Sequence, residues 1–215
     1  DSGLRFGGKD MGKDVIIPYL NSRNWPKIDI LVLTHPHNDH IGGAQYLIEN
    51  GDVGKVLMPD IEYESYGYNM LCQTIHSNKI PTSPVFTGYI DSTLNPIYFR
   101  VTGPKRYDHK SRPSNINNTS ITIQLFYDES SVLLTGDGEE SMEHDQLHLG
   151  SLLKSDMIKA PHHGSKTSSS QEYIELIKPR VCLISLGKKN KFRHPSKITL
   201  EKYTQLGTEI HRTDL

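Results

Sequence analysis

The chain has 215 residues and a formal net charge of −1 at pH 7. That length allows one well-buried core but not two ordinary domains with a linker, so a single domain over residues 1–215 is predicted. The charge gives no overall attraction to nucleic acid or to an anionic membrane. No apolar run reaches the ~18 residues of a membrane-spanning helix, and two cysteines without a C-x-x-C pattern indicate neither a disulfide scaffold nor a thiolate zinc site.

The first part of the chain alternates helix and strand patterns. The polar, glycine-rich residues 1–12 predict a loop, and residues 14–20 have apolar side chains at helical spacing, with Pro18 either in the first turn or distorting the helix. The apolar run 28–33 suits a strand in a sheet that is covered on both faces. Residues 41–49 then predict a helix.

The middle of the chain is more polar. A strand is predicted at 55–58, an amphipathic helix at 62–77, an irregular segment at 81–95 and a strand at 97–101. The apolar stripe of the helix comprises Tyr63, Tyr66, Met70 and Leu71. Core packing is the favoured use of that stripe, with stacking on a ligand as the alternative. The polar segment 103–117 is typical of a loop that serves a site.

The last part of the chain begins with alternating residues at 121–125 and a second apolar run at 132–134, which together predict a hairpin. Further strands are expected at 157–160, 181–186 and 209–213, and helices at 139–149, 168–178 and 196–205. This alternation predicts an α/β fold with sheets covered by helices. The candidate metal ligands all come where predicted strands end.

The pattern H-x-H-x-D-H at residues 35–40 follows one of these strands. His35 and His37, two apart in an extended segment, point to the same side and can hold one ion. Asp39 and His40 turn with the start of the next helix and can face a second ion. A loop of solvated histidines is the plainer alternative, but three histidines and one aspartate beside Gly42-Gly43 favour a metal site.

With this motif the sequence resembles the metallo-β-lactamase superfamily, and in particular the C-terminal domain of the ComEC/Rec2 competence proteins and related stand-alone hydrolases. The further matches are Asp1-Ser2-Gly3, Asn117-Asn118-Thr119-Ser120, Leu134-Thr135-Gly136-Asp137, Pro161-His162-His163-Gly164-Ser165, His194-Pro195 and Arg212-Thr213-Asp214. The resemblance covers the whole chain and implies the αβ/βα metallo-β-lactamase sandwich as one domain. In the family, Asp-Ser-Gly closes a strand after an opening hairpin, so an N-terminal hairpin is expected to be missing before Asp1.

The resemblance also implies a set of metal ligands. His35 and His37 would bind a first ion and Asp39 and His40 a second, with Asp137 bridging the two. The second ion would be completed from the Pro-His-His element. We favour His163 as that ligand and His162 as the group that protonates the leaving oxygen or steadies the transition state, although imidazole chemistry permits the reverse. The cofactor implied is two zinc ions, with manganese as the alternative.

Other predicted site residues have alternative roles. Glu139 is either a proton-transfer group or only an acidic residue in the first turn of a helix. Most superfamily members have a third histidine for the first ion where this chain has Asn117-Asn118, so the first site is expected to bind loosely or to prefer manganese. His109 is a weaker candidate for that ligand. The residues predicted to bind substrate are Asn117, Asn118, Ser165 and His194, and for His194 a structural role stays equally open.

The function predicted is dinuclear, metal-dependent hydrolysis through a metal-bound hydroxide, which Asp39 and Asp137 orient. Phosphodiesters are the favoured substrates, with DNA as one candidate because the ComEC-like relatives are proposed to degrade it. The near-neutral charge makes a small phosphodiester, such as a nucleotide or the substrate of a phosphorylcholine esterase, the main rival.

Other classes are less favoured. β-Lactam hydrolysis is less expected because neither cysteine adjoins a ligand. RNA processing is also less expected, because only 24 residues separate Asp137 from His162, too few for the domain that the RNA-processing members insert there. The non-enzyme alternative is a metal-binding module, which would predict broken motifs. The compartment stays open: outside the cytoplasm if the chain is part of a ComEC-like protein, cytoplasmic if it stands alone. The oligomeric state is also open.

Overall fold

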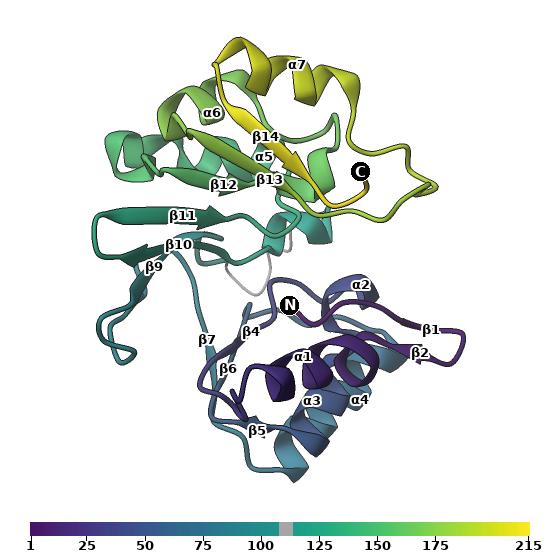
Figure 1. The fold of residues 1–215 in the computed structure, drawn as a ribbon. Coiled ribbons are helices and arrows are strands. Elements are labelled where there is room, and N and C mark those ends of the chain that lie inside the picture. Colours follow the sequence, from purple (N-terminus) through teal and green to yellow (C-terminus); the bar gives the residue numbers. More distant parts are fainter. Residues whose placement is uncertain (108–113) are drawn as a thin grey trace. The chain divides into compact units, whose positions relative to one another are not determined.

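The computed structural model describes residues 1–107 and 114–215. The chain divides into two compact units, Asp1–Val85 and Phe86–Leu215, which are described separately (Figure 1). His109, the weaker candidate ligand, lies outside the described residues. No helix in the described parts of the chain has the length and apolar character needed to cross a membrane.

The first unit is built from short strands and four α-helices. Its strands are β1 (Arg5–Phe6), β2 (Lys9–Asp10), β3 (Lys27–Ile28), β4 (Leu31–Val32), β5 (Asp52–Val53), β6 (Val56–Met58) and β7 (Thr82–Pro84). Its helices are a π-helical turn (Gly12–Ile16), α1 (Ile17–Ser22), α2 (Asn38–Ile41), α3 (Ala44–Asn50) and α4 (Tyr66–Ser77). Strands β4, β6 and β7 form a parallel sheet, and β3 pairs with β5. Apolar side chains of α2, α3 and α4 pack against β4, β5 and β6 in one core.

The predicted loop at residues 1–12 is wrong in part, because it contains the β1–β2 hairpin. Arg5 pairs with Asp10 and Phe6 with Lys9, so Gly7 and Gly8 form a two-residue turn. Their φ angles of +59° and +83° suit the turn type that matches the twist of a hairpin.

The helix predicted at 41–49 is interrupted, and the reason is a close approach of two backbones. A Cβ atom on Gly43 would lie 2.4 Å from the carbonyl oxygen of Ser2 and 2.4 Å from the amide nitrogen of Gly12. Only glycine fits between these segments. The strand predicted at 28–33 is also divided, because β3 pairs with β5 whereas β4 pairs with β6.

Helix α4 begins later than predicted and buries a different face. The Ser65 hydroxyl accepts a hydrogen bond from the amide nitrogen of Tyr68, which fixes the helix start. Tyr68, Leu71 and Ile75 are buried, whereas Tyr66 is 83% exposed. Core packing was therefore wrong for Tyr66 and correct for Leu71.

The second unit contains one seven-stranded sheet. Its strands are β8 (Ile90–Asp91), β9 (Tyr98–Gly103), β10 (Thr122–Tyr127), β11 (Ser130–Leu134), β12 (Met157–Lys159), β13 (Val181–Ile184) and β14 (Glu209–Arg212). Its α-helices are α5 (Glu140–Gln146), α6 (Gln171–Ile177) and α7 (Lys197–Gln205), with short helical turns at Ile116–Thr119, Leu147–Leu153 and Pro161–Gly164. The predicted β10–β11 hairpin is confirmed.

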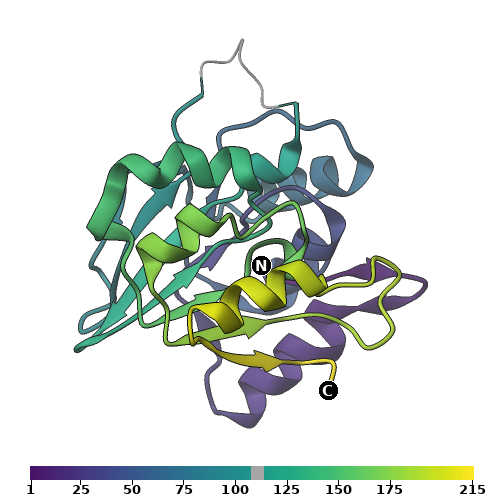
Figure 2. The ribbon, with the colours of Figure 1, turned by 90° about the horizontal axis from the view of Figure 1, so that it is seen from above.

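The order of the strands in this sheet is β14-β13-β12-β11-β10-β9-β8, and β11 to β14 run parallel. Helices α5, α6 and α7 lie over one face of the sheet (Figure 2). Tyr173 of α6 and Tyr203 of α7 are fully buried in the core between these helices and the sheet. Because Leu134, Lys159 and Leu183 stand in register, the segments after β11, β12 and β13 leave the same edge of the sheet.

Candidate metal-binding residues in each unit

The H-x-H-x-D-H segment joins β4 to α2 in the first unit. His35 is 1% exposed, and its Nδ1 lies 3.1 Å from the Thr34 hydroxyl. Its Nε2 lies 3.1 Å from Nδ1 of His37. Two nitrogens bound at about 2.0–2.1 Å to one tetrahedral ion would lie ~3.3 Å apart. The His35–His37 pair thus has a spacing that fits one shared ion.

His40 is oriented by a residue of the N-terminal segment. Its Nδ1 lies 2.8 Å from Oδ2 of Asp1, and Oδ1 of Asp1 accepts a hydrogen bond from the Thr34 amide at 2.8 Å. A carboxylate on one ring nitrogen fixes a histidine so that the other nitrogen can bind a metal. That other nitrogen, Nε2, lies 4.0 Å from Oδ2 of Asp39.

Asp1 is a functional candidate that sequence reasoning missed. Asp1-Ser2-Gly3 matches the family in sequence, but that match alone assigns no role to Asp1. In the structure, the backbone and hydroxyl of Ser2 both donate to the carbonyl oxygen of His40, at 2.7 and 2.9 Å. The motif therefore packs on the helix that presents Asp39 and His40. Because Asp1 and His40 are 39 positions apart, no local pattern could have paired them.

Asp137 stands at the end of β11 in the second unit. Its amide donates to the Ser120 hydroxyl at 3.1 Å, and its Oδ2 lies 3.4 Å from Nε2 of His163. Nδ1 of His163 lies 2.6 Å from the carbonyl oxygen of Ser185, which leaves Nε2 as the nitrogen that faces Asp137. Neighbouring strand ends thus supply a carboxylate and an imidazole that suit one cation.

Lys159, the last residue of β12, is a second residue that sequence reasoning missed. Its Nζ donates to the carbonyl oxygen of Gly136 at 3.1 Å and lies 3.9 Å from Oδ1 of Asp137. The ammonium group therefore steadies the turn that carries Asp137. Its position at a strand end was visible in the sequence, but a lysine is not a usual metal ligand.

His162 faces a different partner from His163. Nδ1 of His162 lies 3.3 Å from Oε1 of Glu139, which also accepts a hydrogen bond from Nδ2 of Asn117 at 2.8 Å. Among the described residues, the buried Oδ1 of Asn117 has no hydrogen-bond partner. Asn118 accepts a hydrogen bond from the Glu139 amide at 2.9 Å. These contacts form a polar network behind His162.

The Pro161–Gly164 turn has an unusual backbone. His162, His163 and Gly164 have φ angles of +46°, +53° and +77°. Left-handed conformations are uncommon for residues other than glycine, and two in succession are a strain that often accompanies function. The turn directs the two adjacent imidazoles toward different carboxylates.

The remaining predicted substrate residues lie around the same turn. Ser165 is buried, and its hydroxyl lies 3.0 Å from that of Thr167, so it helps to build the loop. The rings of His194 and His162 lie 5.6 Å apart between centroids. Burial, and then the nearness of His162 and His163, lowers the pKa of His194. Each unit therefore carries His and Asp groups of the kind that bind metals.

Comparison with known protein families identifies the family of this chain. The model of the metallo-beta-lactamase superfamily matches residues 1–188. The chain belongs to the metallo-β-lactamase superfamily. It is accordingly a metal-dependent hydrolase with the α/β fold of that superfamily, and His and Asp metal ligands of the kind found here are typical of it.

Curated superfamily relatives match nearly the whole chain. ComE operon protein 3 of Bacillus subtilis is 29% identical over 204 residues, which is 95% of this chain and 26% of that protein. Recombination protein 2 of Haemophilus influenzae is 27% identical over 213 residues, which is 99% of this chain and 24% of that protein. The chain thus spans about a quarter of the length of these relatives.

A solved structure supports the superfamily fold. Tm1679, a metal-dependent hydrolase of the beta-lactamase superfamily, aligns with 99% of this chain and 93% of its own, with a TM-score of 0.57 and 14% sequence identity. At that identity the likeness shows the fold alone.

Proposed function

We propose that this hydrolase cleaves phosphodiester bonds with the help of two bound metal ions. The proposal assigns His35, His37, Asp39 and His40 of the first unit and Asp137 and His163 of the second as metal ligands. Asp137 carries the proposal, because its two oxygens have different neighbours: Oδ2 lies near His163, and Oδ1 lies near Lys159. A carboxylate beside an imidazole would hold a cation, and the resemblance to the superfamily assigns Asp137 as the ligand that the two ions would share.

Paired cations, when bound, lower the pKa of a water molecule and neutralise the oxygens of a phosphoryl group. The side chains of the protein orient the proposed ligands and the attacking water. Asp1 holds His40, and Ser185 holds His163, so that each presents Nε2. Asp39 and Asp137 accept protons or hydrogen bonds from the attacking water.

His162 is the proposed proton donor to the departing oxygen. Its side chain is 25% exposed and therefore within reach of substrate, while its Nδ1 faces Glu139. A carboxylate on one ring nitrogen orients the imidazole, so that the other ring nitrogen can transfer a proton to the substrate. Asn117, which donates to the same oxygen of Glu139, fixes the orientation of that carboxylate.

The relatives support a diester substrate but do not define it. One of them is named as a recombination protein, which associates it with DNA. DNA is therefore the first candidate substrate, and a small diester, such as one that contains phosphorylcholine, is the second. A β-lactam is less favoured, because its hydrolysis gains mainly from one nucleophile and one oxyanion contact, whereas a phosphoryl group gains from two cations that span it.

The test compares two model substrates on the full chain after reconstitution with zinc or with manganese. We expect kcat/KM for bis-p-nitrophenyl phosphate to exceed that for a nitrocefin-type cephalosporin. Asp137→Ala should abolish the diester activity. Cys182→Ala is the control, because this buried thiol packs in the core of the second unit and is not a proposed metal ligand. Its activity should stay near that of the wild type.

Two outcomes would contradict the proposal. Faster turnover of the cephalosporin would overturn the substrate class while leaving the fold and the metal ligands unchanged. Diester activity of Asp137→Ala within about tenfold of the wild type, equivalent to ~1.4 kcal/mol of barrier, would show that Asp137 is no bridge. Single-stranded and duplex DNA assayed in parallel distinguish a nuclease from an enzyme for small diesters.

A further inference from the structure

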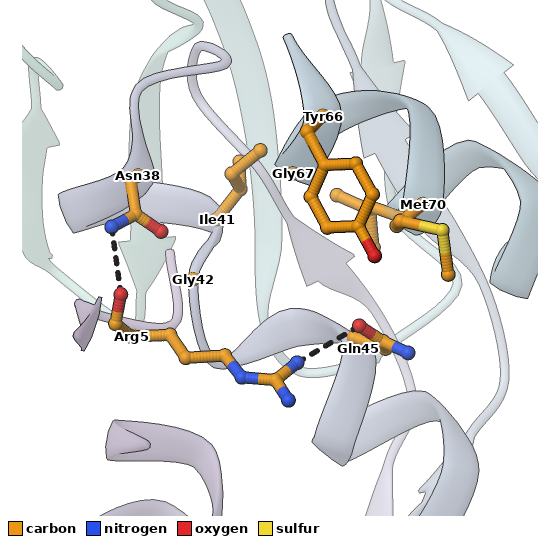
Figure 3. A pocket seen from close by; sticks show the side chains of 9 residues that line it. Arg5, Asn38, Ile41, Gly42, Gln45, Tyr66, Gly67 and Met70 are labelled. Atoms are coloured by element: carbon orange, nitrogen blue, oxygen red, sulfur yellow. Dashed lines mark hydrogen bonds between the residues drawn. The ribbon is translucent and has the colours of Figure 1, made fainter. Parts of the chain in front are cut away.

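A pocket of about 510 Å³ lies within the first unit, beside the helix that carries Asp39 and His40. Its lining comes from β1, α2, α3 and α4 and comprises Arg5, Asn38, Ile41, Gly42, Gln45, Tyr66, Gly67, Met70 and Leu71. Figure 3 shows the side chains of Tyr66 and Met70 on one side and that of Arg5 extended along another. Asn38 directly precedes Asp39 in α2, so the pocket adjoins a proposed metal ligand without including one.

The aromatic part of the pocket is unusually exposed. Tyr66 is the first residue of α4, and its side chain is 83% exposed although Tyr68 and Leu71 of the same helix are buried in the core. Met70, one helical turn later, lines the same pocket. A tyrosine ring with a free face beside a methionine is a suitable surface for a flat, polarisable group.

The polar part of the pocket is organised around Arg5. Nη1 of Arg5 donates to Oε1 of Gln45 at 2.9 Å, and its Nε lies 3.5 Å from Oδ2 of Asp10. The Asn38 amide donates to the carbonyl oxygen of Arg5 at 2.9 Å, which ties β1 to α2. The Arg5 side chain is still 55% exposed. Since a guanidinium has five N–H donors, these contacts leave donors for an anion.

We propose that this pocket binds one nucleotide of a single-stranded nucleic acid next to the bond that is cleaved, with its base stacked on Tyr66 and a neighbouring phosphate on Arg5. The inference rests on the proposed diester hydrolysis and names its substrate class. A stacking face combined with a cationic group is how proteins hold single strands without reading their sequence. A volume of about 510 Å³ is within the usual range for small-molecule sites and is large enough for a base and its sugar.

The same residues disfavour the rival substrate. A choline group carries a permanent positive charge and is usually bound by aromatic faces without a competing cation. Here the guanidinium of Arg5 lines the pocket with Tyr66, and its charge would repel a quaternary ammonium. A phosphate next to a base has the complementary charge.

The test measures binding rather than turnover. The full chain is titrated into a fluorescein-labelled oligothymidylate with EDTA present, and anisotropy gives Kd. Because stacking on an aromatic ring contributes much of the affinity for a single strand, Tyr66→Ala should weaken binding roughly tenfold or more. Tyr66→Phe, which keeps the ring, should bind within about twofold of the wild type. Tyr127→Ala removes an exposed tyrosine of the second unit and serves as the matched control.

Arg5 and Gly67 test the other parts of the pocket. If Arg5 contacts one phosphate, Arg5→Gln should reduce the slope of log Kd against log salt concentration by about 0.7, whereas Tyr66→Ala should leave that slope unchanged. A Cβ atom on Gly67 would meet nothing within 4 Å. Gly67→Trp is therefore expected to fill the pocket and to weaken binding as Tyr66→Ala does, with Gly67→Ala as its size control.

Several results would overturn the inference. These are the absence of oligothymidylate binding by the wild type, equal affinity of Tyr66→Ala and the wild type, and displacement of the oligonucleotide by phosphorylcholine as readily as by thymidine monophosphate. Failure of the proposed function would show separately, as absent turnover of bis-p-nitrophenyl phosphate by the wild-type enzyme, because the binding measurement does not depend on hydrolysis.

Discussion

Asp1 is a carboxylate that orients a proposed metal ligand, His40, without being assigned as a ligand itself. Its Oδ2 faces Nδ1 of His40, and both of its oxygens also contact Thr34. The carboxylate thus fixes the ring orientation and keeps the proton on Nδ1. The electron density that it gives to the ring makes Nε2 a better donor to a metal.

Replacing Asp1 by Asn is expected to weaken metal binding without unfolding the protein. An amide keeps the shape of the carboxylate but lacks its charge, and its nitrogen cannot accept the proton of His40. Loss of such a partner typically costs about 10–100-fold in metal affinity. Competition with a chromophoric chelator measures this affinity for zinc. Asp52→Asn, which changes an exposed carboxylate on β5, is the control, and equal affinities of the two variants would refute the role of Asp1.

The proximity of two side chains could be predicted where the sequence places the residues close together. His35 and His37 are two positions apart in an extended segment, and the structure brings their ring nitrogens to 3.1 Å. The contacts of Asp1 and Lys159 could not be foreseen in this way, because their partners lie 39 and 23 positions away. Such pairs depend on which strands become neighbours, a property of the fold that local spacing does not contain.

At the scale of elements, Asp156 joins the start of β11 to the start of β12. Its Oδ2 accepts hydrogen bonds from the amide and the hydroxyl of Ser131, at 2.9 and 3.0 Å. The amide of Arg180 donates to its carbonyl oxygen at 2.8 Å, so the segment before β13 is held by the same residue. The hydrogen bonds from Ser131, with a smaller contribution from Arg180, lower the pKa of Asp156 below its usual value.

This lowered pKa predicts a pH-dependent stability. Because folding lowers the pKa, the stabilising contribution is complete above the pKa of about 3.9 of an unfolded aspartate and is lost as the pH falls through the lower folded value. Asp156→Asn should therefore reduce the free energy of unfolding by about 1 kcal/mol at pH 7, the difference between a charged and a neutral acceptor. The corresponding fall in Tm is about 2–4 °C.

Thermal unfolding at several pH values measures this effect. The gap in Tm between Asp156→Asn and the wild type should narrow below about pH 4 and disappear once the carboxylate is protonated in the folded state. Glu129→Gln, in the exposed turn between β10 and β11, provides the control with no expected effect. A difference in Tm that stays constant down to the lowest pH would mean that the charge of Asp156 does not contribute to its contacts with Ser131.

Periodicity predicted which elements exist better than it predicted where they break or which face they bury. The helix at 41–49 was foreseen, but its interruption at Gly43 depends on the backbones of Ser2 and Gly12, which no local pattern reveals. Tyr66 fell on the apolar stripe of α4, yet the structure exposes it on a pocket. A stripe indicates the face that can be buried, whereas the neighbours decide how far along the helix the burial extends.

For the whole molecule, the near-neutral charge fits an enzyme that holds its substrate through a few placed groups. With a net charge of −1, long-range attraction contributes little to the binding of a polyanion. Arg5 and the proposed metal ions would then supply most of the positive charge that a phosphodiester meets. Affinity for a single strand is accordingly expected to depend less on salt than that of proteins with many lysine and arginine contacts.

The last prediction concerns the number of metal ions in the whole chain. After reconstitution with zinc or with manganese, elemental analysis should find two ions per chain, because the proposed ligand assignment, taken from the resemblance to the superfamily, gives His35 and His37 to one ion and Asp39, His40 and His163 to the other. His37→Ala should remove the first ion and His163→Ala the second, so each variant should hold one. His76→Ala, at an exposed position of α4, should still hold two. A wild-type chain that binds no metal with either element would refute both the ligands and the mechanism. A wild-type chain with one tightly held ion would refute the expected stoichiometry but agree with a first site weakened by Asn117, and His37→Ala should then leave that ion in place.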